Sequence, residues 1–306
     1  MFFSVIVPCY NTGAAINGLL TSITAQMGAD CELVLVNDGS SDDTGAQIEA
    51  FIAGWQGPCK IIYAATANAG AAKARAHGLT LASGEFIYFC DSDDVIGEQF
   101  VATLRRYAAQ YPAMDVLYFS ADIAVNDNGH LRRLCPKTRY DALRVYDDGN
   151  ELLAHHLREN MYSAAVWTYV ARRDLIARSG AAFTPRAAHE DHLFTLRVIL
   201  GARQIVAVPD LLYIQQVRQG SLTNSRKTPG YIIDRINAYR EADRFLRSQR
   251  ASARAPYANW SLDAVLFLLR GNKQLLPQVL LSPPGAAFVA GNLFAILGKR
   301  GKRSAA

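Results

Sequence analysis

The chain has 306 residues, of which 50% are hydrophobic and 19% charged, so it is long enough for one large domain or two ordinary ones with a substantial core. This composition excludes global disorder and a low-complexity polymer. The formal net charge is +5, with much of the excess in residues 240–254 and 299–303. Because the basic excess is confined to these stretches, it favours contact with anionic lipid or substrate phosphate and does not indicate a nucleic-acid partner.

The first half of the chain alternates short β-branched segments with helical patterns. Strands are expected over residues 3–7, 32–36, 60–64, 85–90 and 115–120. Helices are expected between them, over residues 13–27, 42–54, 70–82 and 97–110. This alternation predicts an α/β fold, a Rossmann-like and mostly parallel sheet flanked by helices.

The second half departs from this regular pattern. Asn128 and Gly129, between apolar residues, predict a hairpin turn. Helices are expected over residues 150–158, 191–200, 231–250 and 261–270, and the last part of the chain is predicted to form a helical C-terminal appendage.

The cysteine spacing and the apolar segments of the chain indicate in which cellular compartment the protein is expected. The five cysteines form no CxxC and no Cys/His metal spacing, so reduced thiols in the cytoplasm are expected, and the N-terminus does not resemble a signal peptide. Residues 285–297 are apolar but too short to cross a bilayer core of ~30 Å, and a basic cluster follows at 299–303. This segment either packs in the core or makes a peripheral contact at the inner face of the cell membrane.

Polar residues follow four of the expected strands. Because ligands bind beyond the carboxyl ends of parallel strands, these residues are expected to line one site. They are Pro8, Tyr10, Asn11, Asp38, Asn68, Gly70, Asp91, Ser92, Asp93 and Asp94.

Asp91 and Asp93 lie close together after a strand, and neighbouring carboxylates repel unless a cation holds them. Oxygen ligands of this kind suit Mn²⁺ or Mg²⁺. The alternative is a helix N-cap with an acidic first turn.

Three other residues have equally open interpretations. Asp38 precedes Gly39 and is either a ligand-binding residue or a turn and cap residue. Lys73 and Arg75 lie at the start of a helix, where the helix dipole disfavours cations unless an anion is near; a solvated basic face is the alternative. Residues 70–75 contain neither a dinucleotide-binding fingerprint nor a P-loop.

Taken in order, the segments FSVIVPCYN (3–11), VNDGSSD (36–42), NAG (68–70) with AR (74–75), and DSDD (91–94) closely resemble the family 2 glycosyltransferases of GT-A fold. The resemblance is strongest over the first third of the chain. It extends to Trp167 with 172–173, to the HED segment at 189–191, to Tyr213 and to residues 218–221. One departure is Ala76, where the family commonly has Asn.

The resemblance implies a role for each matching residue. Asp38 would bind the nucleotide base, Asp91 the ribose and metal, and Asp93 the metal; Asp191 would be the catalytic base, with Glu190 as the next candidate. Trp167 with residues 172–173 would lie on the acceptor side. The remaining donor-binding residues would be Pro8, Tyr10, Asn11, Asn68, Gly70, Lys73, Arg75, Ser92, Arg218 and Ser221.

The resemblance also implies an organisation and an activity. Residues 1–225 would form the catalytic domain, with nucleotide-sugar binding in 1–120 and the acceptor and base region in 121–225, followed by a helical region over 226–306. The activity would be inverting transfer of a sugar from a nucleotide-diphosphate donor, a UDP-sugar, to a hydroxyl of a glycan or lipid-linked acceptor in surface polysaccharide synthesis. The alternatives are a catalytically silent nucleotide-sugar or glycan-binding module and a nicotinamide-dependent oxidoreductase, although the latter needs a glycine-rich turn where this chain has PCYN.

Overall fold

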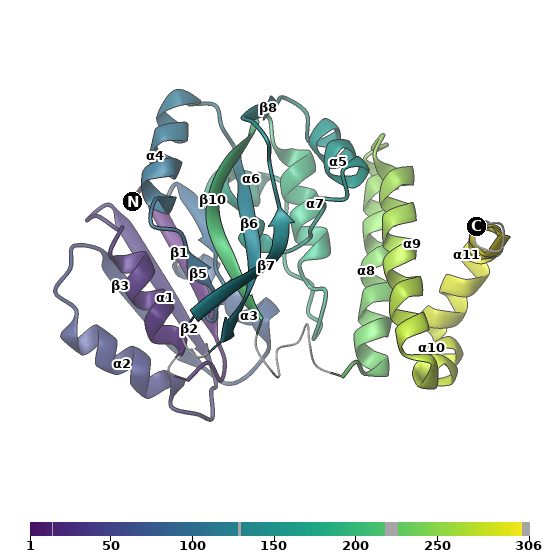
Figure 1. Ribbon diagram of the computed structural model, residues 1–306, viewed down its shortest axis with the longest axis horizontal. Helices are drawn as coiled ribbons and strands as arrows, with labels where there is room; N and C mark the ends of the chain where they lie inside the picture. Colours follow the sequence, from purple (N-terminus) through teal and green to yellow (C-terminus); the bar gives the residue numbers. More distant parts are fainter. Residues whose placement is uncertain (14, 128–129, 218–225, 302–306) are drawn as a thin grey trace. The chain divides into compact units, whose positions relative to one another are not determined.

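The computed structural model describes the backbone of residues 1–13, 15–127, 130–217 and 226–301, and their side chains except at 126–127, 130–137, 217 and 293–301 (Figure 1). The chain divides into two compact units. The first, here called the sheet unit, comprises Met1–Arg186 and Glu190–Ser225. The second, the helical unit, comprises Ala187–His189 and Arg226–Ala306.

Within the described residues, ten strands form one sheet in the sheet unit. The order is β3-β2-β1-β4-β9-β6-β10-β5, with β7 paired to β6 and β8 to β10. The strands are β1 (Phe3–Cys9), β2 (Cys31–Asp38), β3 (Lys60–Thr66), β4 (Phe86–Phe89), β5 (Val95–Ile96), β6 (Val116–Asp127), β7 (His130–Thr138), β8 (Arg144–Tyr146), β9 (Tyr169–Arg172) and β10 (Ile205–Val217).

The first four strands of this order are parallel. Val5 of β1 aligns with Leu33 of β2 and with Tyr88 of β4, and all three side chains are buried. Such central strands, covered on both faces, read in sequence as continuous apolar runs, which is why they could be predicted. The mixed α/β fold with a central sheet is therefore confirmed.

The second half of the sheet is mixed in direction. β9 runs antiparallel to both β4 and β6, whereas β10 is parallel to β6. The expected hairpin at 128–129 is confirmed by the antiparallel pairing of β6 with β7, in which Asp127 faces His130; the two turn residues themselves lie outside the described residues.

Helices cover both faces of the parallel strands. On one face, Ile16 and Leu19 of α1 belong to the same buried cluster as Val5. On the other, α3 packs so closely that a Cβ at Gly78 would lie 2.4 Å from Ile6 Cγ2. The helices of this unit are α1 (Ala15–Thr24), α2 (Thr44–Gly54), α3 (Ala71–Leu81), α4 (Phe100–Gln110), α5 (Gly149–Arg158), η1 (Val166–Thr168), α6 (Arg173–Arg178) and α7 (His192–Gly201).

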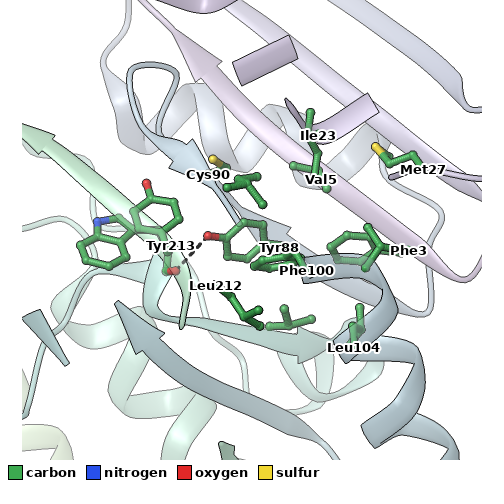
Figure 2. Packing of buried hydrophobic residues seen from close by; sticks show 14 of the residues in the cluster. Phe3, Val5, Ile23, Met27, Tyr88, Cys90, Phe100, Leu104, Leu212 and Tyr213 are labelled. Atoms are coloured by element: carbon green, nitrogen blue, oxygen red, sulfur yellow. Dashed lines mark hydrogen bonds between the residues drawn. The ribbon is translucent and has the colours of Figure 1, made fainter. Parts of the chain in front are cut away.

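An aromatic cluster joins the two halves of the sheet (Figure 2). The Tyr88 ring lies 4.6 Å from the Phe100 ring, and its hydroxyl donates a hydrogen bond to the Trp167 carbonyl at 3.1 Å. The Trp167 and Tyr213 rings are stacked at 4.5 Å. These contacts fix β4, whose carboxyl end leads into Asp91, against β10.

The helical unit comprises α8 (Pro229–Ser248), α9 (Arg254–Gly271), η2 (Lys273–Leu275), α10 (Leu276–Leu281) and α11 (Pro283–Gly301). Figure 1 shows α8 and α9 side by side. The unit has its own buried cluster, which includes Ile232, Ile236, Val265 and Phe288. Phe288 is part of the apolar stretch 285–297, so this stretch contributes at least one side chain to the core of the helical unit. In the part of the chain that the structure describes, no helix combines the length and apolar character needed to span a bilayer.

Candidate active site

The loops that follow β1, β2 and β4 meet through their own hydrogen bonds. The Asn11 amide donates to Ser40 Oγ at 3.1 Å, and the Ser41 amide donates to Asn11 Oδ1 at 2.8 Å. The hydroxyls of Thr12 and Ser92 are 2.7 Å apart. Polar residues from three strand ends are therefore held together at the carboxyl edge of the parallel strands, as the sequence indicates.

Asp38 fixes a fourth loop to this edge. Its Oδ1 accepts a hydrogen bond from the Ala69 amide and its Oδ2 one from the Gly70 amide, both at 2.8 Å. The buried carboxylate thus lies against the start of α3, where the helix dipole favours negative charge. The next residue must be glycine, because Gly39 has φ +66° and a Cβ there would lie 2.6 Å from the Asn68 amide nitrogen.

Arg75 joins two segments that are far apart in sequence. From α3, its Nη2 lies 2.8 Å from Asp91 Oδ1 and its Nη1 lies 2.6 Å from Glu190 Oε1. The Arg75 and Glu190 side chains are only 10% and 12% exposed, and that of Asp91 is 30% exposed. Burial opposes the charge of the guanidinium, but the charges of Asp91 and Glu190 raise the pKa of Arg75, so the arginine stays charged.

Lys73 is not part of this cluster. It lies two positions before Arg75 on α3, and residues at that spacing point in different directions on a helix. Its side chain is exposed, as the solvated-face alternative expects.

The residue after Glu190 has a different environment. Asp191 is the N-cap residue of α7, and its side chain makes no capping hydrogen bond. Burial and the charge of Glu190 raise the pKa of Asp191 to about 7, with Arg75 acting in the opposite direction. A carboxyl group with this pKa can accept a proton near neutral pH.

Asp94 is held by the end of β10. The Tyr213 hydroxyl donates to Asp94 Oδ2, the Gln216 amide donates to Asp94 Oδ1 at 2.7 Å, and Gln216 Nε2 donates to the Asp93 carbonyl at 3.0 Å. Burial and the charge of Asp91 raise the pKa of Asp94 to about 7. Sequence reasoning counted Asp94 among the polar residues at this edge but gave it no role, although it stands in the DSDD segment and Tyr213 belongs to the same resemblance.

Asp91 and Asp93 are half-buried at the same strand end. Among the described residues, no group of three His, Cys, Asp or Glu side chains could hold a metal ion. Two carboxylates nevertheless fit a divalent ion of the Mg²⁺ type, which binds one or two protein carboxylates and takes its other ligands from water and substrate phosphates.

The remaining predicted residues fall into three groups. Tyr10, at 53% exposure, and Asn68 lie exposed beside the site loops, and Pro8 is half-buried at the end of β1. Trp167 is buried in the aromatic cluster rather than exposed to an acceptor. Arg218 and Ser221 lie outside the described residues.

Arg172 lies away from this edge. Arg172 pairs with Glu85, which precedes β4, whereas Asp91 follows that strand. The Arg172 Nη2 also donates a hydrogen bond to the Pro112 carbonyl at 2.8 Å. Arg172 thus ties the opposite end of β4 to the neighbouring loop and is not a component of the candidate site.

A family model described as glycosyl transferase family 2 matches residues 4–169, and the chain belongs to this family. An uncharacterized glycosyltransferase YibD of Escherichia coli K12 is 28% identical over 210 residues, covering 69% of this chain and 60% of the relative. An uncharacterized glycosyltransferase EpsJ of Bacillus subtilis is 30% identical over 223 residues, covering 72% of this chain and 62% of the relative.

Solved structures share the fold. The crystal structure of Staphylococcus aureus TarS 1–349 in complex with UDP-GlcNAc has a TM-score of 0.63 and 25% identity, covering 79% of this chain and 66% of that one. TarS is a poly(ribitol-phosphate) beta-N-acetylglucosaminyltransferase, 28% identical to this chain over 216 residues. The matches span about 60% of the length of the first two relatives and 66% of the TarS structure.

Proposed function

We propose that this protein is an inverting glycosyltransferase that moves a sugar from a nucleotide-diphosphate donor, a UDP-sugar, to a hydroxyl group of a glycan or lipid-linked acceptor. The observation that carries the proposal is the pairing of Arg75 with both Asp91 and Glu190. This pairing brings the strand end expected to bind the donor next to the carboxylates expected to activate the acceptor. Family membership supports the same reaction.

The donor would bind along the loops after β1, β2, β3 and β4. The exposed ring of Tyr10 offers a face on which a nucleotide base can stack. We assign Asp38 to the base side of the donor site, where it also holds the Ala69 and Gly70 amides in place.

Asp91 and Asp93 would hold Mn²⁺ or Mg²⁺. When bound, such an ion neutralises the charge that develops on a leaving diphosphate. Arg75 keeps one oxygen of Asp91 in a fixed position through its 2.8 Å contact, so the carboxylate is oriented before a ligand arrives.

Asp191 would take the proton of the acceptor hydroxyl. Glu190 is engaged by Arg75, whereas the Asp191 side chain makes no capping bond and has a pKa raised to about 7, near the ideal value for a general base at neutral pH. Direct displacement needs one base and no protein nucleophile, and it inverts the configuration at the sugar carbon.

The acceptor is proposed from the relatives. TarS is named for transfer to poly(ribitol-phosphate), so we assign this protein to surface polysaccharide synthesis as well. We place it in the cytoplasm, in peripheral contact with the inner face of the cell membrane, where lipid-linked acceptors are available. The basic residues Lys299, Arg300, Lys302 and Arg303 support this contact.

A donor screen tests the proposal. Purified protein is incubated with a panel of nucleotide sugars, Mn²⁺ and bacterial glycolipid or polysaccharide fractions, and glycosylated product is detected by mass spectrometry. Product is expected with one or more UDP-sugars and should disappear when a chelator removes the metal. Binding of UDP-sugars without turnover of any would instead identify the silent binding module, and full activity in chelator would contradict the metal.

A further inference from the structure

The helical unit contains a groove rich in arginine. It encloses about 570 Å³ and is formed by α8, α9 and α11. Its charged lining consists of four arginines and two carboxylates: Arg240, Arg244, Arg247, Glu241 and Asp243 from α8, and Arg254 from α9. We call it the arginine groove.

The spacing of these arginines concentrates positive charge. Arg240, Arg244 and Arg247 follow one another at intervals of four and three residues, which places them on one face of α8. Like charges at this spacing repel and destabilise a helix unless an anion is near.

Only part of this charge is neutralised within the protein. Asp243 lies 2.8 Å from Arg254 Nε and 3.5 Å from Arg247 Nη2. Among the described residues, no carboxylate lies within 4 Å of the Arg240 or Arg244 guanidinium, and the Arg244 Nε donates only a long bond of 3.4 Å to the Arg240 carbonyl. Two cations therefore face the groove with their donors available.

Part of the remaining lining is small or apolar, beside the polar residues Asn237, Tyr239 and Asn292. The small or apolar part includes Ala258 of α9, and Ala287, Phe288 and Gly291 of α11. Ala287 and Gly291 are four residues apart, so they lie on the same face of their helix. A ligand that joins an anionic group to an apolar part complements a groove of this composition.

We propose that the arginine groove binds the phosphate headgroup of an anionic phospholipid at the membrane surface. Guanidinium groups form paired, charge-assisted hydrogen bonds with phosphate oxygens, and the apolar lining would contact the glycerol and first acyl carbons. The backbone of α11 continues to Gly301, and its sequence adds Lys299 and Arg300, which an anionic surface attracts. The inference rests on the proposed membrane contact and is independent of sugar transfer.

Vesicle sedimentation tests the inference with the full chain. The vesicles are equimolar phosphatidylglycerol and phosphatidylcholine, or phosphatidylcholine alone, and no nucleotide sugar is present. The test variant is Arg240→Ala with Arg244→Ala. The control is Arg270→Ala with Lys273→Ala, which removes the same charge from exposed positions of the same unit.

The groove predicts that the wild type sediments with phosphatidylglycerol vesicles and not with phosphatidylcholine alone. Removing any two surface charges reduces the long-range attraction to the vesicles, so both variants should bind more weakly than the wild type. The vesicle affinity of the test variant should be about tenfold lower than that of the control, because the test variant also loses direct phosphate contacts. Thermal unfolding is measured for both variants, so that a loss of binding caused by misfolding is recognised. A third variant, Arg240→Lys with Arg244→Lys, keeps the charge but not the paired guanidinium donors, and it should recover less than half of the lost binding.

Three results would overturn the proposal. One is absence of wild-type binding to phosphatidylglycerol vesicles at low salt. Another is an equal loss in the test and control variants, which would indicate general surface attraction. The third is binding of glycerol 3-phosphate as tight as that of vesicles, which would identify a soluble phosphate as the ligand. The assay contains no sugar donor, so all three outcomes can be interpreted even if the protein does not transfer sugars.

Discussion

Arg75 is the residue on which the candidate site depends most. Its guanidinium pairs with Asp91 and Glu190, which are 16 and 115 positions away in the sequence. Sequence reasoning selected all three residues, but it assigned Arg75 to donor binding. The structure adds that Arg75 also organises two carboxylates, a role that no sequence spacing reveals because the partners belong to different loops.

Replacement of Arg75 should therefore affect both stability and activity. Arg75→Ala leaves Glu190 and Asp91 without their buried partner, and breaking such a pair costs about 3 kcal/mol in free energy of unfolding. Sugar transfer should fall as well, because both carboxylates lose their fixed positions. Denaturant unfolding and nucleoside-diphosphate release measure the two effects. His77→Ala, at an exposed position of the same helix, is the stability control, and an equal change in the two variants would contradict this assignment.

The raised pKa of Asp191 predicts a pH profile. A base must be deprotonated to accept a proton, and burial with the charge of Glu190 raises the pKa of Asp191 to about 7. The rate kcat/KM should therefore rise about tenfold per pH unit below 7 and level off above it. A profile that is flat from pH 5 to pH 8, measured as initial rates at low donor concentration, would exclude this group as the base.

At the scale of elements, β10 connects the core to the candidate site. Its Tyr213 side chain lies in the aromatic cluster (Figure 2), where the ring stacks on that of Trp167. The Tyr213 hydroxyl donates a hydrogen bond to Asp94. Sequence reasoning predicted neither β9 nor β10. In β10, Pro209 and Asp210 interrupt the apolar pattern, and the strand accommodates them by register shifts against β6 between Ala207 and Leu211.

Tyr213→Phe tests this connection. The substitution keeps the ring stack but removes the hydroxyl donor to a buried carboxylate, which should cost about 1–3 kcal/mol of unfolding free energy. It should also weaken donor binding, since Asp94 loses one of its two hydrogen bonds to β10 and keeps only the one from the Gln216 amide. Tyr111→Phe, whose hydroxyl accepts from the exposed Gln110 side chain, is the matched control. Urea unfolding and calorimetry with UDP measure the changes, and a Tyr213 variant that behaves like the control would contradict the connection.

At the scale of the whole molecule, the parallel half of the sheet was the most predictable part. Continuous apolar strands with helices between them specify this arrangement locally, whereas the short or interrupted strands of the other half depend on their neighbours. In the helical unit, α9 begins at Arg254 rather than at 261, with Pro256 tolerated in its first turn. The candidate site was predictable as a set of residues and not as a network, because its contacts join separate loops.

The core of the helical unit provides a prediction at this scale. Phe288 is 1% exposed and its ring lies 5.8 Å from the Tyr239 ring, so Phe288→Ala should cost about 3–5 kcal/mol. Phe267→Ala, at a position 76% exposed in the same unit, should cost less than about 1 kcal/mol. Thermal and denaturant unfolding of the full chain compare the two variants. Equal costs would show that the apolar segment of α11 does not pack as described.

The central claim, that Asp191 is the base of a sugar transfer at this site, is tested most directly by the rate of nucleoside-diphosphate release in Asp191→Asn. The amide keeps the size of the side chain and cannot accept the proton, so turnover should fall about 10²-fold or more. Donor binding should stay within a factor of about two, since the strand-end carboxylates that hold the donor are unchanged. A variant that releases nucleoside diphosphate at the wild-type rate would contradict the account and transfer the role to another carboxylate, with Glu190 next in line.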